Sequence, residues 1–391
     1  MGTSGEMGDQ MISPVRRFGF SEEHAGLEDT LASIAERIRK QEGQRWKVAK
    51  ALAGLRDVTL EGVEEIIEPF LVKSIDQDAL VNLTVAGVDG GMLEQQLHGL
   101  DLILLRAVVA IFRYQNSRLE WAKYFPSEMP FPRLIDVAEP LDAREFELLA
   151  GMERQLTEIE LATEALRANK VKLLLLDGSV VPQYIDRFPH KQSLLERYHK
   201  LLNAYTKLYE TCAESGALLA GAVKDSRGGR FVDILRHKVL PSLGGLGLGE
   251  RELEILERSR DTVLLDHVLG VGERTSIFRY AESPSRYVLR DLGEWAMRVY
   301  AFYIKTVPFD RPLRVEFIDV RDEPAETADR VAPLIYALSS HHDAFGLPSV
   351  LIEADVCARL TEEDLSIVRD SIADRLGPSA LLDLRRHRRP F

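Results

Sequence analysis

Four consecutive leucines, Leu173–Leu176, restrict the fold of this 391-residue chain more than any other feature. The surrounding segment 171–176 is apolar except for Lys172 near its start. A strand without polar side chains on either face must be covered on both faces, as in sheets that lie between layers of helices. The run therefore predicts an α/β protein with this strand at the centre of its sheet.

A second apolar run, residues 83–88, also ends at an aspartate. It is followed by Asp89-Gly90-Gly91, and the leucines are followed by Asp177-Gly178-Ser179. Asp-Gly is a common turn dipeptide, so a turn at the end of a strand explains either copy by itself. Two copies after two apolar strands also fit a ligand site, because open α/β sheets bind ligands at the carboxyl ends of their strands.

Two aspartates at the ends of neighbouring strands are chemically informative. Their negative charges repel each other unless a cation lies between them. Magnesium and manganese prefer oxygen ligands of this kind. The sequence therefore predicts a divalent cation held by Asp89 and Asp177.

The remaining pattern of apolar residues predicts a mixed sheet flanked by helices. A helical arm with a break near Gly43 is expected within residues 1–80, after a disordered start, and a main domain over 81–391. Residues 226–250 are expected to hold a helix between flexible loops. The predicted helices cover residues 27–55, 60–79, 143–168, 190–214, 324–340 and 350–376. The predicted strands cover residues 83–88, 92–97, 100–114, 171–176, 217–223, 275–281, 295–305 and 313–319.

A third carboxylate is expected from the helix 143–168, which carries several acidic residues. Glu160 is favoured because it adjoins the apolar stripe of this helix, and Glu153 is the alternative. Glu158 and Glu164 are also available, and most acidic residues on such a helix face solvent.

Two further residues are candidates for the same site. Asp355 lies among apolar residues near the start of the last predicted helical region. The helix dipole favours an acidic residue at the start of a helix, and this explains Glu353 better than Asp355. Lys224 ends the strand 217–223 and could bind a phosphate, although a plain surface lysine explains it equally well.

Composition narrows the class of protein. The net charge of −12, from 50 basic and 62 acidic residues, argues mildly against a protein that coats DNA without sequence preference. We interpret the basic cluster at residues 385–389 as a tail that is exposed to solvent. No apolar run approaches the ~18–20 residues of a membrane span, and the N-terminus lacks a signal peptide. These features predict a cytoplasmic protein that does not enter a membrane, with Cys212 and Cys357 as buried free thiols.

At these residues the sequence resembles the NurA nuclease family. The resemblance rests on Val88-Asp89-Gly90-Gly91, on the acidic helix with Glu160, and on the leucines with Asp177-Gly178-Ser179. It extends to Val223-Lys224-Asp225-Ser226 and to the closing segment 346–355, and so covers about residues 83–360.

The resemblance implies a ribonuclease H-like core and a homodimer. It also implies manganese- or magnesium-dependent cleavage of single-stranded DNA and of duplexes from their 5′ ends, with two ions. Asp89, Glu160 and Asp177 would be metal ligands, and the partner would be a hexameric HerA-type ATPase that acts in DNA end resection. The family often has Tyr-Pro and a His where this chain has Leu347-Pro348 and Asp355, and an Asp can replace a His as a ligand.

Two other functions compete with a nuclease. Actin-like ATPases and sugar kinases also place an Asp-Gly turn beside a phosphate, but no second Gly-rich phosphate loop is evident in this sequence. A non-catalytic adaptor that docks a motor ATPase would suit the N-terminal helices and the acidic charge.

Overall fold

The computed structural model describes residues 19–54, 56, 58–60, 62–76, 80–183, 191–244, 248–284 and 287–377. An eleven-stranded mixed sheet organises the molecule, with the order β1-β8-β10-β11-β7-β6-β2-β3-β4; β5 pairs with β3 and β9 with β10. The strands are β1 (Val72–Ser74), β2 (Leu83–Gln96), β3 (Asp101–Gln115), β4 (Arg118–Phe125), β5 (Arg133–Val137), β6 (Leu173–Asp177), β7 (Leu218–Val223), β8 (Glu273–Thr275), β9 (Phe278–Arg279), β10 (Val299–Lys305) and β11 (Leu313–Ile318).

The helices lie on both sides of this sheet and beyond its far end. They are α1 (Gly19–Ala53), α2 (Ala143–Ala168), α3 (Gln192–Ser215), α4 (Arg230–Ile234), α5 (Leu240–Ser242), α6 (Glu250–Glu257), α7 (Asp261–Leu265), α8 (Pro324–Ser339), α9 (Ser349–Ala358) and α10 (Glu362–Leu376). A π-helical turn, Leu235–Val239, joins α4 to α5, and a 3₁₀ segment, Tyr287–Arg298, precedes β10.

The middle of the sheet has the expected ribonuclease H-like arrangement. Strands β2, β3 and β4 form an antiparallel meander, and β6 and β7 run parallel to β2. Strands β11 and β10 continue the sheet beyond β7 in antiparallel pairing. The α/β class and the mixed sheet predicted from the sequence are therefore confirmed.

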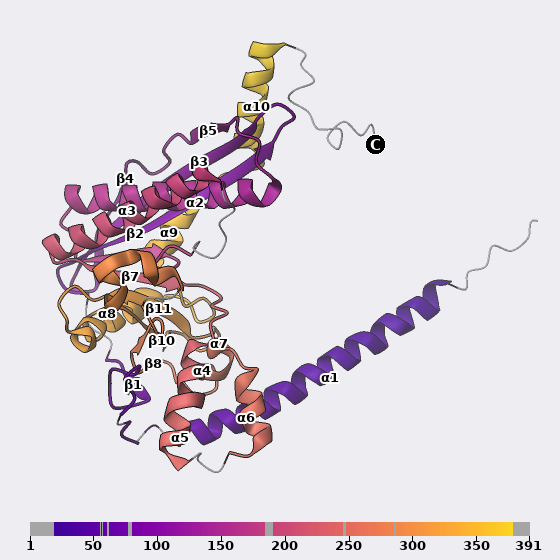
Figure 1. Ribbon diagram of the computed structural model, residues 1–391, viewed down its shortest axis with the longest axis vertical. Helices are drawn as coiled ribbons and strands as arrows, with labels where there is room; N and C mark the ends of the chain where they lie inside the picture. The colour runs from indigo at the N-terminus through magenta and orange to yellow at the C-terminus, as the bar shows by residue number, and fades with distance from the viewer. Residues whose placement is uncertain are drawn as a thin grey trace, which may run out of the picture.

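Helices cover both faces of the central strands (Figure 1). Helices α2 and α3 pack on one face against alternate residues such as Val88 and Leu174, and α8 and α9 pack on the other against Val85 and Leu175. The four leucines of β6 are all buried. The prediction that this strand is covered on both faces is confirmed, because its side chains point alternately into the two cores.

Helix α1 extends away from the rest of the molecule, and only its C-terminal end joins the body (Figure 1). Val48, Ala49 and Leu52 are buried there in a third core formed with α4, α6 and α7. The break predicted near Gly43 does not occur, since one helix of 35 residues passes through it. Among the described residues, no helix combines the length and apolar character needed to cross a membrane.

Several predicted elements are wrong in detail. Within the predicted helix 60–79, the described residues 62–76 are not helical: β1 pairs with β8, and bends at Gly62 and Pro69 precede it. Proline removes a backbone donor and interrupts a helix, and the long-range pairing with β8 stabilises the extended form instead. The segment 92–97 is not a separate strand, because β2 continues unbroken past Asp89 to Gln96.

The closing region also differs from its prediction. Residues 350–376 form two helices, α9 and α10, since Thr361 begins a new helix with a capping box in which its hydroxyl accepts from the backbone N–H of Asp364. Strands β4 and β5 were not predicted. Cys212 and Cys357 are buried and free, as expected. A disordered start was predicted over residues 1–20, of which residues 1–18 lie outside the described residues and Gly19 and Phe20 belong to α1. The basic tail at 385–389 also lies outside the described residues.

Candidate active site

Asp89 and Asp177 are neighbours across two parallel strands. The pairing of β2 with β6 ends at Val88 and Leu176, so the next residue on each strand is one of the aspartates. Adjacent strands lie about 4.8 Å apart. The structure therefore brings together the two carboxylates that the Asp-Gly motifs indicated.

The glycines around Asp89 do not make a turn. A Cβ on Gly90 would lie 2.5 Å from Oε1 of Glu158, and a Cβ on Gly91 would lie 2.2 Å from the carbonyl oxygen of Ala358 at the end of α9. These glycines let helices on opposite faces approach a continuous strand. At Asp177 the turn is real, because Gly178 has a φ of +126°, which side chains rarely tolerate.

The alternation of side chains along β2 defines the face on which Asp89 lies. Gly87 and Gly91 both face α9, so Asp89, midway between them, faces the same way. Gly90 faces α2. Beyond Val88 the edge of β2 is no longer paired with β6. Carboxylates from both faces can therefore meet around this open edge.

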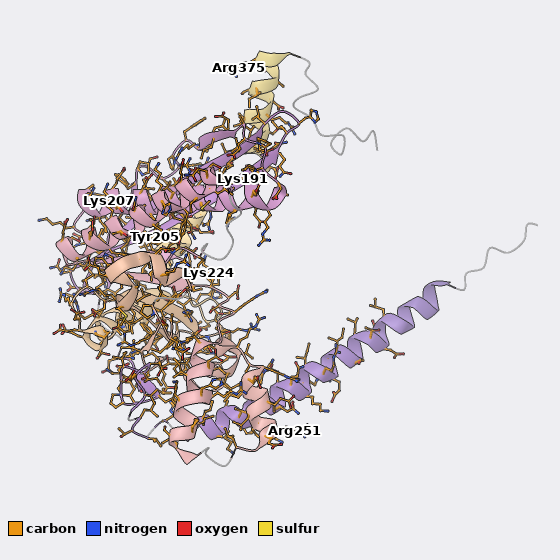
Figure 2. The ribbon with its side chains drawn as sticks, viewed as in Figure 1. Lys191, Tyr205, Lys207, Lys224, Arg251 and Arg375 are labelled. Carbon is orange, nitrogen blue, oxygen red and sulfur yellow. The ribbon has the colours of Figure 1, made fainter. Side chains whose placement is uncertain are left out.

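Lys224 joins the site from the next strand. It follows the last residue of β7, and its Nζ donates to Oδ2 of Asp177 over 2.5 Å. Figure 2 places Lys224 near the middle of the molecule, between the part with Tyr205 and the part with Arg251. Lys224 is therefore half-exposed and paired to a candidate ligand.

The carboxylate that α2 directs toward Asp89 is Glu158, not the predicted Glu160. Glu158 is buried and accepts from Nη1 of Arg154 over 2.7 Å, whereas Glu160 is exposed to solvent. Two residues along a helix rotate the side chain by about 200°, so the two glutamates point in opposite directions. The alternative, Glu153, is buried but pairs with Nε of Arg197 over 2.7 Å on α3.

A signal for Glu158 was present in the sequence. Ala162 and Ala165 follow it by four and seven residues, which places all three on one line of the helix. Both alanines are completely buried. Small side chains on this line let α2 lie close to the sheet, so it is the line from which a glutamate reaches β2. Glu160 adjoins the apolar stripe in sequence, but it does not lie on this line of the helix.

Asp355 is placed near the site by α9, on the same face as Asp89. Its Oδ2 accepts from Arg359 over 3.3 Å, and its charge acts on Asp89. Glu353, two residues earlier, instead accepts from the hydroxyl of Tyr124 over 2.7 Å. Leu347, at the position where the family often has Tyr, is buried in the core beneath α9.

Burial and mutual repulsion make these carboxyls hard to ionise. Burial, and then the charge of Asp177, raises the pKa of Asp89 from 3.8 to about 7. Burial raises the pKa of Glu158 from 4.5 to about 8, against the lowering effect of Arg154 and with added repulsion from Asp89 and Asp177. A bound cation would remove this repulsion and favour the ionised forms.

The donor set fits a hard divalent cation, because it consists of carboxylate oxygens on a rigid scaffold. In the part of the chain that the structure describes, however, no three acidic, His or Cys side chains are close enough to surround one ion as they stand. Lys224 and Arg154 instead neutralise Asp177 and Glu158. Electrostatic coupling acts over longer distances than ligation, so the raised pKa values of Asp89 and Glu158 indicate neighbouring carboxylates and not a complete set of ligands.

A buried polar cluster behind Asp177 was missed by the sequence reading. Ser179 donates to Oε2 of Glu316 over 2.5 Å, and Nε of Arg314 donates to Oε1 of the same residue over 2.7 Å. Arg314 and Glu316 are both on β11 and nearly inaccessible to solvent. The cluster holds the loop after Asp177 against the sheet.

Comparison with known proteins agrees with this architecture. The family model for the NurA domain matches residues 83–360. The crystal structure of the NurA nuclease from Sulfolobus solfataricus is 15% identical, with a TM-score of 0.53 over 90% of this chain and 97% of that chain. A crystal structure of NurA with manganese is 12% identical, with a TM-score of 0.50 over 91% of this chain and 100% of that chain.

At such identities the structural likeness shows the fold. No curated protein matches the chain by sequence. The family model, however, spans most of the chain, from the first residue of β2 to just beyond α9, and includes each of the carboxylates described above. The chain belongs to the NurA family.

Proposed function

We propose that this protein is a divalent-metal-dependent deoxyribonuclease. The observation that carries the proposal is the in-register pair Asp89 and Asp177, with the buried Glu158 beside them, in a member of the NurA family. Carboxylates brought together at such a cost in repulsion are typical of catalytic sites rather than of structural ones.

Asp89, Asp177, Glu158 and Asp355 are the residues that would hold Mn²⁺ or Mg²⁺, and we propose two ions. Glu158 takes the place that the sequence assigned to Glu160. Paired divalent ions activate water and stabilise the leaving oxygen in phosphodiester hydrolysis. The crystal structure of NurA with manganese supports the choice of metal.

Lys224 has a separate role in this proposal. Its ammonium neutralises Asp177 in the structure. With a cation on Asp177, the ammonium would be free to turn toward a phosphate and stabilise the negative charge that develops there. Lys224 therefore binds and orients substrate, and the aspartates bind metal.

The finer assignments follow family membership. We propose 5′–3′ exonuclease and single-strand endonuclease activity on DNA in the cytoplasm, in end resection with a hexameric HerA-type ATPase. Membership of the NurA family supports the nuclease function on which these assignments depend.

We also propose a homodimer that forms through α1. Leu27, Leu31, Ile34 and Ile38 repeat at alternating spacings of four and three residues, and between 38% and 54% of each is exposed. This spacing gives a narrow apolar seam that pairs with an identical helix in a coiled coil. The projection of α1 from the body leaves its seam accessible to a second copy (Figure 1).

The nuclease proposal is tested by cleavage of end-labelled single- and double-stranded DNA with manganese, magnesium or EDTA. The wild type is expected to cut with metal only, and Asp177→Asn to lose the activity. Glu160→Gln is the matched control, because its exposed side chain is not part of the site, and it is expected to cut as the wild type does. Absence of cleavage by the wild type in every metal would contradict the proposal and favour an adaptor of the ATPase.

A further inference from the structure

A chain of hydrogen bonds leads from the loop after Asp177 across the sheet to α7. Its members, in order from the loop, are Ser179, Glu316, Arg314, Tyr303 and Asp261. We call these five residues the buried network, since all of them except Ser179 are nearly inaccessible to solvent. The network connects the candidate active site with the helical part of the molecule that holds the end of α1.

The register of the sheet explains why Glu316 can reach Ser179. In the antiparallel pairing of β11 with β7, Glu316 lies directly opposite Gly221. Paired residues point to the same face, and Gly221 has no side chain to stand between Glu316 and the loop after β6. That loop passes close over Gly221, because a Cβ there would lie 2.3 Å from the carbonyl oxygen of Gly178. The glycine and the glutamate together seat the loop on β7.

The hydroxyl of Ser179 uses all of its hydrogen-bonding capacity. It donates to Oε2 of Glu316 over 2.5 Å, and it accepts from the backbone N–H of Val181 over 3.2 Å and from Nε2 of Gln183 over 3.1 Å. A hydroxyl has one hydrogen and two lone pairs. Alanine at this position would therefore release the loop from β11 and remove the bonds that hold its own turn together.

Asp261 is the fixed end of the network. Its carboxylate accepts from the backbone N–H groups of Phe231 and Val232 over 3.0 and 2.9 Å, and from the hydroxyl of Tyr303 over 2.9 Å. Burial raises the pKa of Tyr303, so this hydroxyl keeps the proton that it donates. Three donors satisfy the buried carboxylate and leave Tyr303 one orientation.

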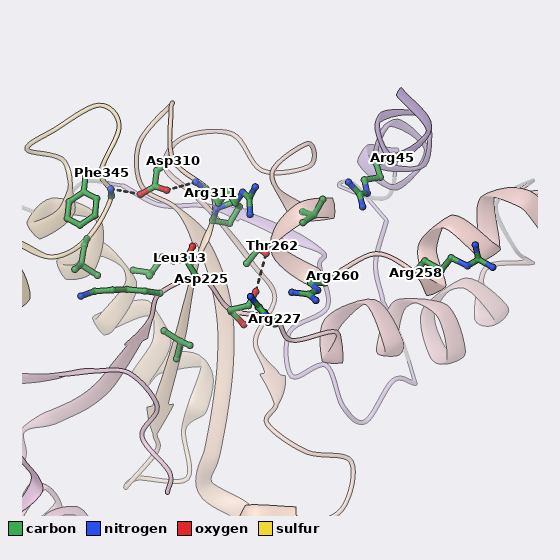
Figure 3. A pocket seen from close by; sticks show the side chains of 17 residues that line it. Arg45, Asp225, Arg227, Arg258, Arg260, Thr262, Asp310, Arg311, Leu313 and Phe345 are labelled. Atoms are coloured by element: carbon green, nitrogen blue, oxygen red, sulfur yellow. Dashed lines mark hydrogen bonds between the residues drawn. The ribbon is translucent and has the colours of Figure 1, made fainter. Parts of the chain in front are cut away.

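The start of α7 also holds the loop after Lys224. The backbone N–H of Asp261 donates to the carbonyl oxygen of Gly228 over 3.0 Å, and Thr262 donates to that of Ser226 over 3.3 Å (Figure 3). This loop borders a cavity of about 560 Å³, which is lined by arginines from α1, from the loops after β7 and α6, and from the turn between β10 and β11. Their positive charges repel one another, so the position of the loop depends on such contacts.

Stability of the fold is a poor explanation for this network. Arg314 and Glu316 form a buried ion pair over 2.7 Å. Loss of hydration offsets the attraction in such pairs, and apolar residues of similar size are often as stable. A satisfied polar network does fix geometry, because each member has one orientation that completes its hydrogen bonds. Residues behind metal ligands orient those ligands in this way.

We propose that Ser179, held by Glu316, is a positioning residue that fixes the carboxylate of Asp177 in the orientation needed for a divalent cation. The inference rests on the proposed nuclease function and deepens it, since it assigns a role to a residue outside the ligand set. Within the described residues, Lys224 is the one group that donates to this carboxylate. With Lys224 turned away, the backbone of the loop determines where the carboxylate points.

The test is calorimetric titration of the full chain with Mn²⁺, without DNA. Ser179→Ala removes the hydroxyl and Ser179→Thr keeps it, and the cavity of about 840 Å³ beside Ser179 has room for the added methyl group. Ser215→Ala is the matched control, because its hydroxyl donates within α3 and it precedes β7 at the end opposite Lys224. Circular dichroism verifies that each variant is folded.

Loss of a residue that orients a metal ligand lowers metal affinity or activity by about 10–100-fold. Ser179→Ala is therefore expected to bind Mn²⁺ about tenfold or more weakly, with an unchanged number of sites per chain. Ser179→Thr and Ser215→Ala should bind as the wild type does. A role in folding alone would lower the number of sites and not their affinity. The Mn²⁺ concentration for half-maximal cleavage should rise with Ser179→Ala by the same factor.

Tyr303→Phe tests the rest of the network. It removes the hydroxyl between Arg314 and Asp261, keeps the ring, and leaves Asp261 its two backbone donors. We expect it to weaken Mn²⁺ binding in the wild type and to add nothing in Ser179→Ala, since residues that act through one another are not additive.

Three results would overturn the role of Ser179: wild-type affinity in Ser179→Ala, an equal loss in Ser179→Thr, and full additivity with Tyr303→Phe. If Ser179→Ala does not fold, wild-type affinity in Tyr303→Phe decides against the network. Each of these results leaves cleavage by the wild type and its loss in Asp177→Asn intact. A wild type that neither binds Mn²⁺ nor cuts DNA would instead overturn the nuclease proposal as well.

Discussion

Replacement of Glu158 by Gln tests the electrostatics of the site directly. In the folded protein, burial raises the pKa of this carboxyl from 4.5 to about 8. The protonated form is therefore favoured by folding, and its contribution to stability is fully present below about pH 4.5. That contribution is lost as the pH rises through about 8, because the native state must then hold a buried charge.

The expected magnitude follows from the size of this change in pKa. Each pKa unit corresponds to about 1.36 kcal/mol, so ionisation of Glu158 costs the folded state roughly 4–5 kcal/mol relative to the unfolded chain. Gln has nearly the same shape and no charge, so the variant avoids this cost. With an unfolding entropy of about 2.1 cal/mol/K per residue, this stabilisation raises the Tm of a 391-residue chain by about 5 °C.

The assay is thermal unfolding in EDTA at about pH 5 and about pH 9, on either side of the raised pKa. We expect wild type and Glu158→Gln to differ little in the acid buffer and the variant to be more stable in the alkaline one. Glu160→Gln, two residues away and exposed, is the matched control and should behave as the wild type in both. An equal difference between wild type and Glu158→Gln at the two pH values would refute the reasoning.

Three further predictions concern other parts of the molecule. Because the pKa of Asp89 is raised to about 7, protons compete with the metal for this carboxylate. Calorimetry should therefore show that the affinity for Mn²⁺ rises by up to about tenfold per pH unit as the pH increases toward 7. Asp89→Asn should flatten this dependence on pH. Leu31→Glu should make the dimer a monomer in analytical ultracentrifugation, whereas Ser33→Glu, outside the seam of α1, should not. Gly221→Ala should lower the free energy of unfolding by about 1–3 kcal/mol and impair cleavage. The reason is that a Cβ at position 221 would lie 2.3 Å from the carbonyl oxygen of Gly178. An unchanged unfolding curve in urea would contradict this prediction.

Local patterns predicted the centre of this protein well. The leucines of β6 required cover on both faces, and the alternation of strands and helices indicated the mixed sheet. Asp177 and Lys224 were proposed together because each follows an apolar run, and strands of a parallel sheet end at a common edge. These predictions depend on spacing along the chain, which secondary structure preserves.

Other features depend on contacts between distant segments. Asp89-Gly90-Gly91 has the composition of a turn, yet β2 continues through it because β3 pairs with it throughout and helices need the space that the glycines leave. Strand β1 forms only because β8, some 200 residues later, offers it a partner. Neither fact is visible in a window of sequence.

By itself, the sequence determined the mixed α/β order of the central elements and the two aspartates that follow their apolar runs, since both are read from the apolar runs and the residues that terminate them. Only the tertiary structure decided that Glu158 and not Glu160 faces the sheet, and that arginines from four segments line one cavity. The rotation of a helix about its axis and the meeting of distant loops are decided by packing, which depends on all the elements at once.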